Sequence, residues 1–504
     1  MSGEYIKKPI ENFMKLHQPH LYFNNIEKVN LQRLSPNNNT NNLGAGGQPI
    51  TFHKGRTNDY IRLSDSYLEI TFTYNTQTPA LTNADGADIT FENDFVSKLF
   101  DTVELRFGGY TIEIISNSYR ATELAGYVLY SSDEDKQSGY SFGWIPDYGA
   151  GSSELSLSGL VGALSLVTAI PTTAAINTAL NALTLSGNAP GGNIPAVNNS
   201  GYSKRKIFYN KPQLALYSVT ANSARTVTLC VPLWHFFQSI TSYDKILCNL
   251  DIDLTLIRDS TGSGRWAYSQ VAATNIGLTI NSINWCIPYY RLSMEGLEVM
   301  SKQLQSKDDM EMICLTRFMG SQSALIPMTN TNFVYDMGAK ANIPRYVIVG
   351  MKWATLNNVN VLDQVTANRS LLTHGFVSDM YITIGSERYP YSTMNCDFPN
   401  NKYAVPYQMF RDFCRSMGIS TSTDYIDFRD RFPIFCFDLT ARASLLDTNT
   451  TSQSVQINVM RTVPNPLPPG YNAADTLNLY ALQFNERHFM INFASGNVRS
   501  PDKF

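Results

Sequence analysis

The sequence has little charge for its length. Lys, Arg, Asp and Glu together make up 16% of the 504 residues, and the formal net charge at pH 7 is −3. A chain of this kind lacks the broad basic field that gives proteins affinity for phosphate backbones. We therefore expect no sequence-specific binding of nucleic acid by this chain.

Cysteine and long apolar runs are also scarce. The seven cysteines are odd in number and widely spaced, and no CxxC pair occurs, which favours buried free thiols over a disulfide framework. No run reaches the roughly 18 apolar residues of a membrane span, and the N-terminus lacks the apolar core of a signal peptide. We expect a protein made in a reducing intracellular compartment, without a membrane span.

The motifs of metal and phosphate chemistry are missing as well. No HExxH motif is present, and the histidines have no metal-ligand spacing with cysteines or carboxylates; they are His17, His20, His53, His235, His374 and His488. The Gly-rich residues 43–47 lack the Lys-Ser/Thr of a phosphate-binding loop, and no nucleophile elbow is recognisable. We predict no catalytic residue, no cofactor and no metal site.

One carboxylate pair could form a catalytic or cation-binding site, against the prediction that the chain has none. Asp251 and Asp253 are two residues apart on an expected strand, so they face one side, where they could flank a sugar or bind a cation. Asn249 and Thr255 continue the same polar face, which favours an ordinary amphipathic strand. Residues 234–238 (WHFFQ) are likewise interpreted as a strand end packed in a core, in preference to a platform for stacking bases.

What the sequence does contain favours β-structure. Aromatic residues make up 12% of the chain, with 28 Tyr and 26 Phe, and 43% of the residues are hydrophobic. Residues 60–74 show two alternating apolar runs interrupted at 64–66, which predicts two strands with a bend between them. Residues 103–115 predict a hairpin that turns at Gly108 and Gly109. The chain is predicted to be mainly β.

One unit of structure occurs twice along the chain. In the first half, a hairpin at 103–115 is followed by a helix at 119–130 and by strands at 226–234 and 249–257. In the second half, a strand at 380–384 precedes a helix at 407–418, strands at 432–439 and 454–460, and a final strand pair within 477–493. Regularly spaced strands with polar turns are typical of sandwiches and jelly rolls.

This repeat sets the predicted domain boundaries. They are an N-terminal arm at 1–49, a first jelly roll at 50–293, a linker helix at 294–307, and a second jelly roll with a C-terminal tail at 308–504. The first unit carries a large insertion at 146–202 that is rich in small residues and nearly free of charge. Because it is also apolar, we expect it to pack on itself or on a neighbouring subunit, with a weakly marked helix at 174–183.

Several segments, in this order, resemble a known family. They are YIRLSDSYLEI at 60–70, FVSKLFDTVELRFGG at 95–109, YDKILCNLDIDLTLIR at 243–258, IPRYVIVG at 343–350 and YIDFRDRFPIFCFDLT at 425–440. They are similar to the double jelly-roll major capsid proteins of the Polinton and adintovirus lineage, which also includes virophages and, more distantly, adenovirus hexon. The resemblance covers nearly the whole chain from about residue 50.

The resemblance implies an all-β protein of two tandem eight-stranded antiparallel jelly rolls. It further implies homotrimeric, pseudo-hexagonal capsomers that tile the icosahedral shell of a double-stranded DNA virus or virus-like element. The partners would be neighbouring capsomers, penton proteins and minor capsid proteins, and the location would be the virion, assembled inside the host cell. The insertion at 146–202 would project outward, and the arm would lie on the inner side.

Two other interpretations stay open at this point. Lectin-like jelly rolls bind glycans, so a glycan-binding two-domain β-sandwich is the alternative function. A glycoside hydrolase that uses Asp251 and Asp253 is the third.

Overall fold

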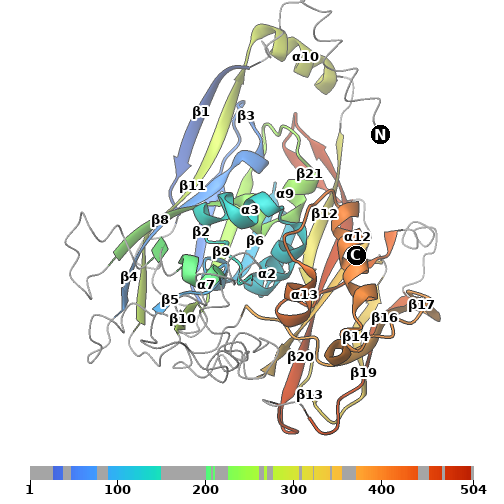
Figure 1. The fold of residues 1–504 in the computed structure, drawn as a ribbon. Helices are drawn as coiled ribbons and strands as arrows, with labels where there is room; N and C mark the ends of the chain where they lie inside the picture. Colours follow the sequence, from blue (N-terminus) through green and yellow to red (C-terminus); the bar gives the residue numbers. More distant parts are fainter. Residues whose placement is uncertain are drawn as a thin grey trace, which may run out of the picture.

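A computed structural model gives the fold (Figure 1). It describes residues 26–37, 47–76, 89–148, 200–205, 208–209, 225–259, 266–269, 276–305, 309–321, 323–340, 343–354, 370–440, 453–467 and 471–500. Most of the insertion expected at 146–202, including the helix expected at 174–183, lies outside these ranges, as does the arm before residue 26.

Eleven strands in the described residues build the first half of the molecule. They are β1 (Ile26–Leu34), β2 (Pro49–Lys54), β3 (Tyr60–Ile61), β4 (Tyr67–Thr76), β5 (Ile89–Phe91), β6 (Phe100–Phe107), β7 (Tyr110–Ser116), β8 (Arg225–Pro232), β9 (Ile252–Arg258), β10 (Ala267–Ser269) and β11 (Ile276–Leu292). β5 and β10 pair with each other in a separate two-stranded sheet. Of the two main sheets, one has the order β1-β11-β4-β8, with β3 beside β11, and the other has the order β2-β9-β6-β7. The two sheets enclose one core, in which Phe52 and Trp285 meet edge to face.

The second half repeats this plan. Its strands are β12 (Met310–Met319), β13 (Ile326–Pro327), β14 (Asn332–Lys340), β15 (Tyr346–Trp353), β16 (Val377–Ile384), β17 (Glu387–Tyr389), β18 (Phe435–Asp438), β19 (Gln453–Arg461), β20 (Thr476–Asn492) and β21 (Asn497–Arg499). One sheet has the order β12-β20-β15-β18, with β13 and β21 beside β20, and the other has the order β14-β19-β16-β17. All pairings are antiparallel.

The two halves share one topology. The sheet β1-β11-β4-β8 corresponds strand for strand to β12-β20-β15-β18, and β2-β9-β6-β7 corresponds to β14-β19-β16-β17. Eight strands therefore recur in the same order in each half. The fold is a double jelly roll, as the sequence predicts.

Short helices fill the connections. They are α2 (Ser118–Leu129), α3 (Ser132–Lys136), α7 (Ser200–Arg205), α8 (Leu233–Phe236), α9 (Gln238–Ser242), α10 (Met294–Gln305), α12 (Ala404–Ser416) and α13 (Tyr425–Asp430), with 3-10 turns at Leu63–Asp65, Ser97–Leu99, Ser138–Ser141 and Phe398–Asn400. Helices α2 and α12 occupy the same place in the two rolls, between the hairpin and the next strand. In Figure 1, α2 lies in the middle of the molecule, and α10 lies at one end beyond β11.

Several local predictions are confirmed. Gly108 and Gly109 turn the β6–β7 hairpin with φ angles of 53° and 85°, in the region that glycine reaches most easily. A 3-10 turn separates β3 from β4 where the apolar alternation is interrupted. The helices expected at 119–130 and 407–418 are α2 and α12, and the linker helix expected at 294–307 is α10.

Other predictions need correction. The final strand pair expected within 477–493 is one 17-residue strand, β20. Its polar residues 485–488 form no turn, because they continue the ladder with β12 without a break. Residues 233–242 form the short helices α8 and α9, although their placement in the core is as expected. Cys230 is exposed on β8, whereas the other six cysteines are buried, and all seven are free thiols.

The segment expected as an arm contributes a strand. β1 pairs with β11 along the edge of the first roll, between residues 26 and 34. Its side chains are nearly all exposed, so no alternation of apolar and polar residues marks it in the sequence. Part of residues 1–49 thus belongs to the sheet.

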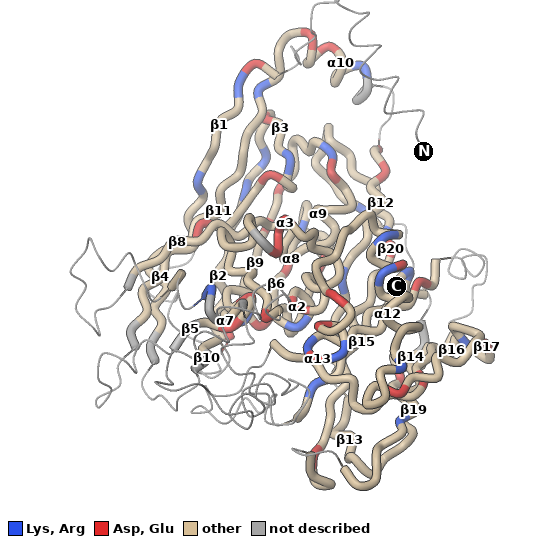
Figure 2. The backbone as a smooth tube through the Cα atoms, viewed as in Figure 1, with Lys and Arg blue, Asp and Glu red and all other residues tan. Residues whose placement is uncertain are grey.

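Charges of both signs are interspersed over both rolls (Figure 2). Within the described ranges, no group of three or more His, Cys, Asp and Glu side chains lies close enough together to hold a metal ion. None of the described helices has the length and hydrophobicity of a membrane span.

Candidate functional site

The two rolls meet along a surface centred on α2, which we call the seam. It consists of α2, β7 and α9 of the first roll and β12, β15 and β20 of the second roll. Eleven of the twelve residues of α2 are buried, so this helix lies between the rolls and has no solvent face. Because both rolls pack against this helix, its stability depends on contacts with both of them.

An ion pair crosses the seam from α2 to β15. The Lys352 ammonium lies 2.5 Å from a carboxylate oxygen of Glu123, and both side chains are buried. Burial lowers the pKa of Lys352 to about 8, with the nearby cations Arg120 and Lys98 acting in the same direction and Glu123 opposing them. The Arg120 guanidinium also lies 3.9 Å from the ring centre of Tyr480 on β20.

A second buried carboxylate ties three elements together. Glu113 of β7 accepts backbone hydrogen bonds from Ser239 of α9 at 2.8 Å and from Arg317 of β12 at 2.6 Å. Burial raises the pKa of Glu113, and these hydrogen bonds act against that rise. The side chain thus joins the edge strand of the second roll to the first roll.

The side chain of Arg317 extends this connection into the first roll. It donates to the backbone oxygen of His235 at 2.8 Å and to the Gln238 side chain at 3.0 Å. Burial lowers the pKa of Arg317, while the Glu113 carboxylate is among the groups that oppose this effect. Removal of this guanidinium would leave buried acceptors without their donor.

Two further contacts complete the connection between the rolls. Lys98 pairs with Glu92 at 2.7 Å inside the first roll and donates to Ser370 of the second roll at 3.1 Å. On the last turn of α2, the ring of Tyr127 stacks on Phe432 of the second roll, with centroids 4.1 Å apart. The seam therefore combines charge-assisted hydrogen bonds with aromatic packing.

A serine, a histidine and an aspartate meet in the first roll without forming a catalytic triad. The Oγ atom of Ser97 and Oδ1 of Asp94 both lie 2.8 Å from the same ring nitrogen of His235, Nε2. In a triad, the acid and the nucleophile bind opposite ring nitrogens. Here Tyr130 occupies the other nitrogen, and all four side chains are buried. The group is a buried polar network.

The carboxylate pair considered in the sequence lies outside the seam. Asp251 pairs with Arg56 at 2.8 Å, and Asp253 pairs with His53 at 2.6 Å across the β2–β9 ladder. Each carboxylate contacts its own basic side chain, and both carboxylates are partly exposed. This arrangement is that of an amphipathic strand, and it gives no positive support to hydrolysis by this pair.

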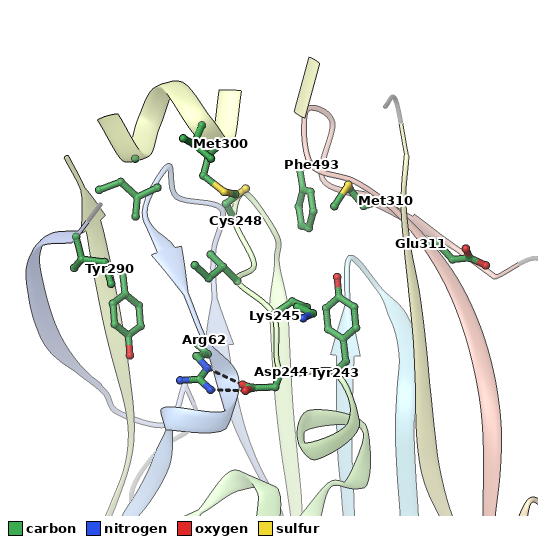
Figure 3. Close-up of a pocket in the computed structure, with 15 residues that line it drawn as sticks. Arg62, Tyr243, Asp244, Lys245, Cys248, Tyr290, Met300, Met310, Glu311 and Phe493 are labelled. Atoms are coloured by element: carbon green, nitrogen blue, oxygen red, sulfur yellow. Dashed lines mark hydrogen bonds and ion pairs between the residues drawn. The ribbon is translucent and has the colours of Figure 1, made fainter. Parts of the chain in front are cut away.

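A groove opens at the end of the molecule beneath α10 (Figure 3). It holds about 680 Å³, and its wall comes from both rolls and from α10; the lining residues include Ile26, Tyr243, Cys248, Leu292, Val299, Met300, Met310 and Phe493. Figure 3 shows Met300 reaching from α10 toward Cys248. Arg62 and Asp244 form an ion pair on the groove wall, and its hydrogen bonds lower the pKa of Asp244 to about 2.

Comparison with protein-family models identifies the family of the chain. The model of the double jelly roll-like domain matches residues 203–468, which is more than half of the sequence. The chain therefore belongs to the double jelly roll-like domain family. A search among curated proteins finds no match.

Solved structures show the same fold over almost the full length. A chain of the Sputnik virophage, determined by cryo-EM, matches with a TM-score of 0.56 and 9% identity, covering 97% of this chain and 93% of that one. The major capsid protein of mavirus matches with a TM-score of 0.50 and 14% identity, covering 97% of this chain and 98% of that one. At these identities the likeness concerns the fold.

The sequence did not reveal the seam. Glu113 and Arg317 are 204 positions apart, and Glu123 and Lys352 are 229 apart, so no local pattern links them. One signal was available: α2 carries Arg120, Thr122 and Glu123 within a helix whose other side is apolar, and all three are buried. A helix buried on every side needs partners for such groups.

Proposed function

We propose that this chain is a major capsid protein of an icosahedral double-stranded DNA virus or virus-like element. The observation that carries the proposal is the seam, which joins two rolls of one topology through a buried ion pair, buried hydrogen bonds and aromatic packing. A tile made of two similar units in a fixed relationship suits a shell, because three such chains present six similar units around one axis. The double jelly roll family and the mavirus major capsid protein fold support the same conclusion.

The proposed capsomer is a pseudo-hexagonal homotrimer, similar in outline to hexon. Exposed apolar side chains on the outer sheet of the second roll support a contact between chains. Val334 of β14 is 56% exposed and Met460 of β19 is 39% exposed, and the register places the two strands side by side. Apolar groups that gather on a surface mark contacts between proteins.

The proposed partners are neighbouring capsomers together with penton and minor capsid proteins. The proposed location is the virion, with assembly inside the host cell, and the proposed relatives are the Polinton and virophage lineage. The domain boundaries at 50–293, 294–307 and 308–504 remain part of this proposal, and the part of the expected arm at 1–49 that forms β1 (Ile26–Leu34) is added to the first roll. The interspersed charges support a container that does not read DNA sequence, and we propose no enzymatic activity.

Mass measurement in solution tests the homotrimer. The purified chain should give three times its own 56.4 kDa, and Val334→Glu should shift the population toward the single-chain mass because a charge would be buried at the contact. The matched variant Val334→Thr keeps a branched side chain and should retain the trimer. A single-chain mass for the natural protein at micromolar concentration would count against the proposal.

A further inference from the structure

Helix α10 covers the groove but leaves much of its own apolar surface uncovered. Met294 is 84% exposed, Leu297 is 41% exposed and Val299 is 49% exposed, and the main tertiary contact of the helix is with β11. Isolated helices of about 12 residues are marginal in water and need packing partners. Something that supplies apolar side chains should therefore pack against α10, and Val299 places part of this surface in the groove wall.

The N-terminal segment of the chain is connected to the described structure beside this groove. Ile26, at the start of β1, lines the groove, so the chain that precedes it joins the described structure at the groove. Those residues lie outside the described part of the chain, and their sequence contains IENFMKL at 10–16. Ile10, Phe13 and Met14 follow the i, i+3, i+4 pattern of one helix face.

The rest of this short segment fits an amphipathic helix. Pro9 stands immediately before it, where proline suits the first turn of a helix. Glu11 and Lys15 are four residues apart with the acid first, which is the favourable order on a helix surface. As a helix, the segment would have one apolar face and one charged face.

We propose that residues 10–16 of the chain dock in this groove, with Ile10, Phe13 and Met14 packed against the apolar wall beneath α10. Residues 17–25 form the connection, and nine residues span at most about 30 Å, enough for the chain to turn back from Ile26 into the groove that Ile26 lines. A tether of this length gives an effective concentration on the order of millimolar, which favours the segment of the same chain over a free competitor.

The groove has the size and character that such docking needs. Its volume of about 680 Å³ lies within the range of about 300–1,000 Å³ that is usual for sites that enclose mainly apolar groups. Lys245 and Glu311, which also line it, are both exposed and carry one charge of each sign, as do Glu11 and Lys15. The segment and the groove therefore match in polarity as well as in apolar surface.

Hydrogen exchange of the full-length chain, followed by mass spectrometry, tests the docking. Residues 10–16 should exchange at least tenfold more slowly than residues 17–25. Met300→Glu, which places a charge in the groove, should abolish this protection, whereas Ser301→Glu on the exposed neighbouring position of α10 should leave it unchanged. Rapid exchange of 10–16 in the natural chain, or protection that survives Met300→Glu, would overturn the proposal.

Cross-linking decides whether the segment comes from the same chain. In a Cys230→Ser background, Asn12→Cys and Ser301→Cys together place one thiol on the segment and one on α10, and a short bismaleimide can join them. A cross-linked product that runs at single-chain mass on a denaturing gel supports the proposal, and each single-cysteine variant provides the control. A product of two-chain mass would show that a second copy fills the groove, and it would refute docking within one chain.

Discussion

Glu123 of α2 and Lys352 of β15 form an ion pair that crosses from one jelly roll to the other and is buried on both sides. Each charge is stable there only because the other is present, since removing either charge from water is costly. The pair therefore makes the relative position of the rolls part of the folded state. A shell subunit needs two halves in a fixed relative position, because movement at a hinge between them would disrupt its contacts with neighbouring subunits.

Removal of one member of this pair should destabilise the protein more than removal of both. We expect Glu123→Gln to lower the free energy of unfolding by about 3–5 kcal/mol, because it leaves the Lys352 ammonium buried without a counter-charge. The double variant Glu123→Gln/Lys352→Met should recover most of this loss. Urea unfolding of the four proteins in the double-mutant cycle measures the coupling, and a coupling energy near zero would show that the pair does not hold the rolls together.

Asp135 gives the protein a specific pH dependence. Its side chain accepts hydrogen bonds from Trp144 at 2.7 Å and Tyr148 at 2.9 Å, and burial raises its pKa from 3.8 to about 6 in spite of them. Between these two values, the folded state keeps a proton that the unfolded state has released. Stability should therefore fall as the pH rises from 4 to 6, by a total on the order of 3 kcal/mol, and the loss should be complete above pH 6.

The variant Asp135→Asn isolates this contribution, because its amide does not titrate. Urea midpoints measured from pH 4 to pH 7 should show the variant gaining stability relative to the natural protein as the pH rises. Parallel pH profiles for the two proteins would mean that Asp135 titrates near its ordinary pKa, and the assignment of this pH dependence to Asp135 would then fail.

Gly126 should not tolerate even a methyl group. Alanine is usually better than glycine inside a helix by about 1 kcal/mol, but a Cβ atom at Gly126 would lie 2.3 Å from the Trp144 ring. We expect Gly126→Ala to lower the thermal midpoint by several degrees, since overpacking a core costs about 1–3 kcal/mol. Gly55→Ala is the matched control, because a Cβ atom there meets only His53, at 3.7 Å. Equal midpoints for the two variants would contradict this account of α2.

The insertion should be removable without unfolding the rolls. Its two ends meet at a buried ion pair between Asp147 and Arg205, 2.7 Å apart, and Gly201 packs directly against Pro146. Replacing residues 152–200 by a short Gly-Ser linker should therefore leave the unfolding midpoint of the subunit unchanged. If the insertion packs on a neighbouring subunit, the trimer should dissociate at lower urea concentration; if it packs on itself, trimer dissociation should be unchanged. Unchanged trimer dissociation would remove that role.

Local patterns predict much of this fold, but they do not predict its seam. The turn at Gly108 and Gly109 and the helix that follows it are visible in the sequence because each depends on neighbours a few residues away. β20 was expected as two strands, and its residues 485–488 are polar in the way that is typical of a turn. In the structure these residues pair with β12 within one continuous ladder, which the sequence alone does not show. β1 was missed because its side chains are nearly all exposed, so no alternation of apolar and polar residues marks it.

The contacts between the rolls depend on long-range geometry. Glu113 looked like an ordinary polar residue of a hairpin, yet it accepts from the backbone of β12, 204 residues further on. The resemblance to capsid proteins predicted that two rolls stand side by side, but it did not say which side chains join them. Polar residues within the α2 helix were the one local sign, and their partners became visible only with the fold.

Negative-stain electron microscopy of the purified full-length chain, alone and with a penton partner, tests the capsid proposal most directly. The account predicts particles of hexagonal outline with threefold symmetry for the chain alone, and closed icosahedral shells or hexagonally packed sheets when the partner is added. Particles the size of single chains under both conditions, at all salt concentrations tested, would contradict it.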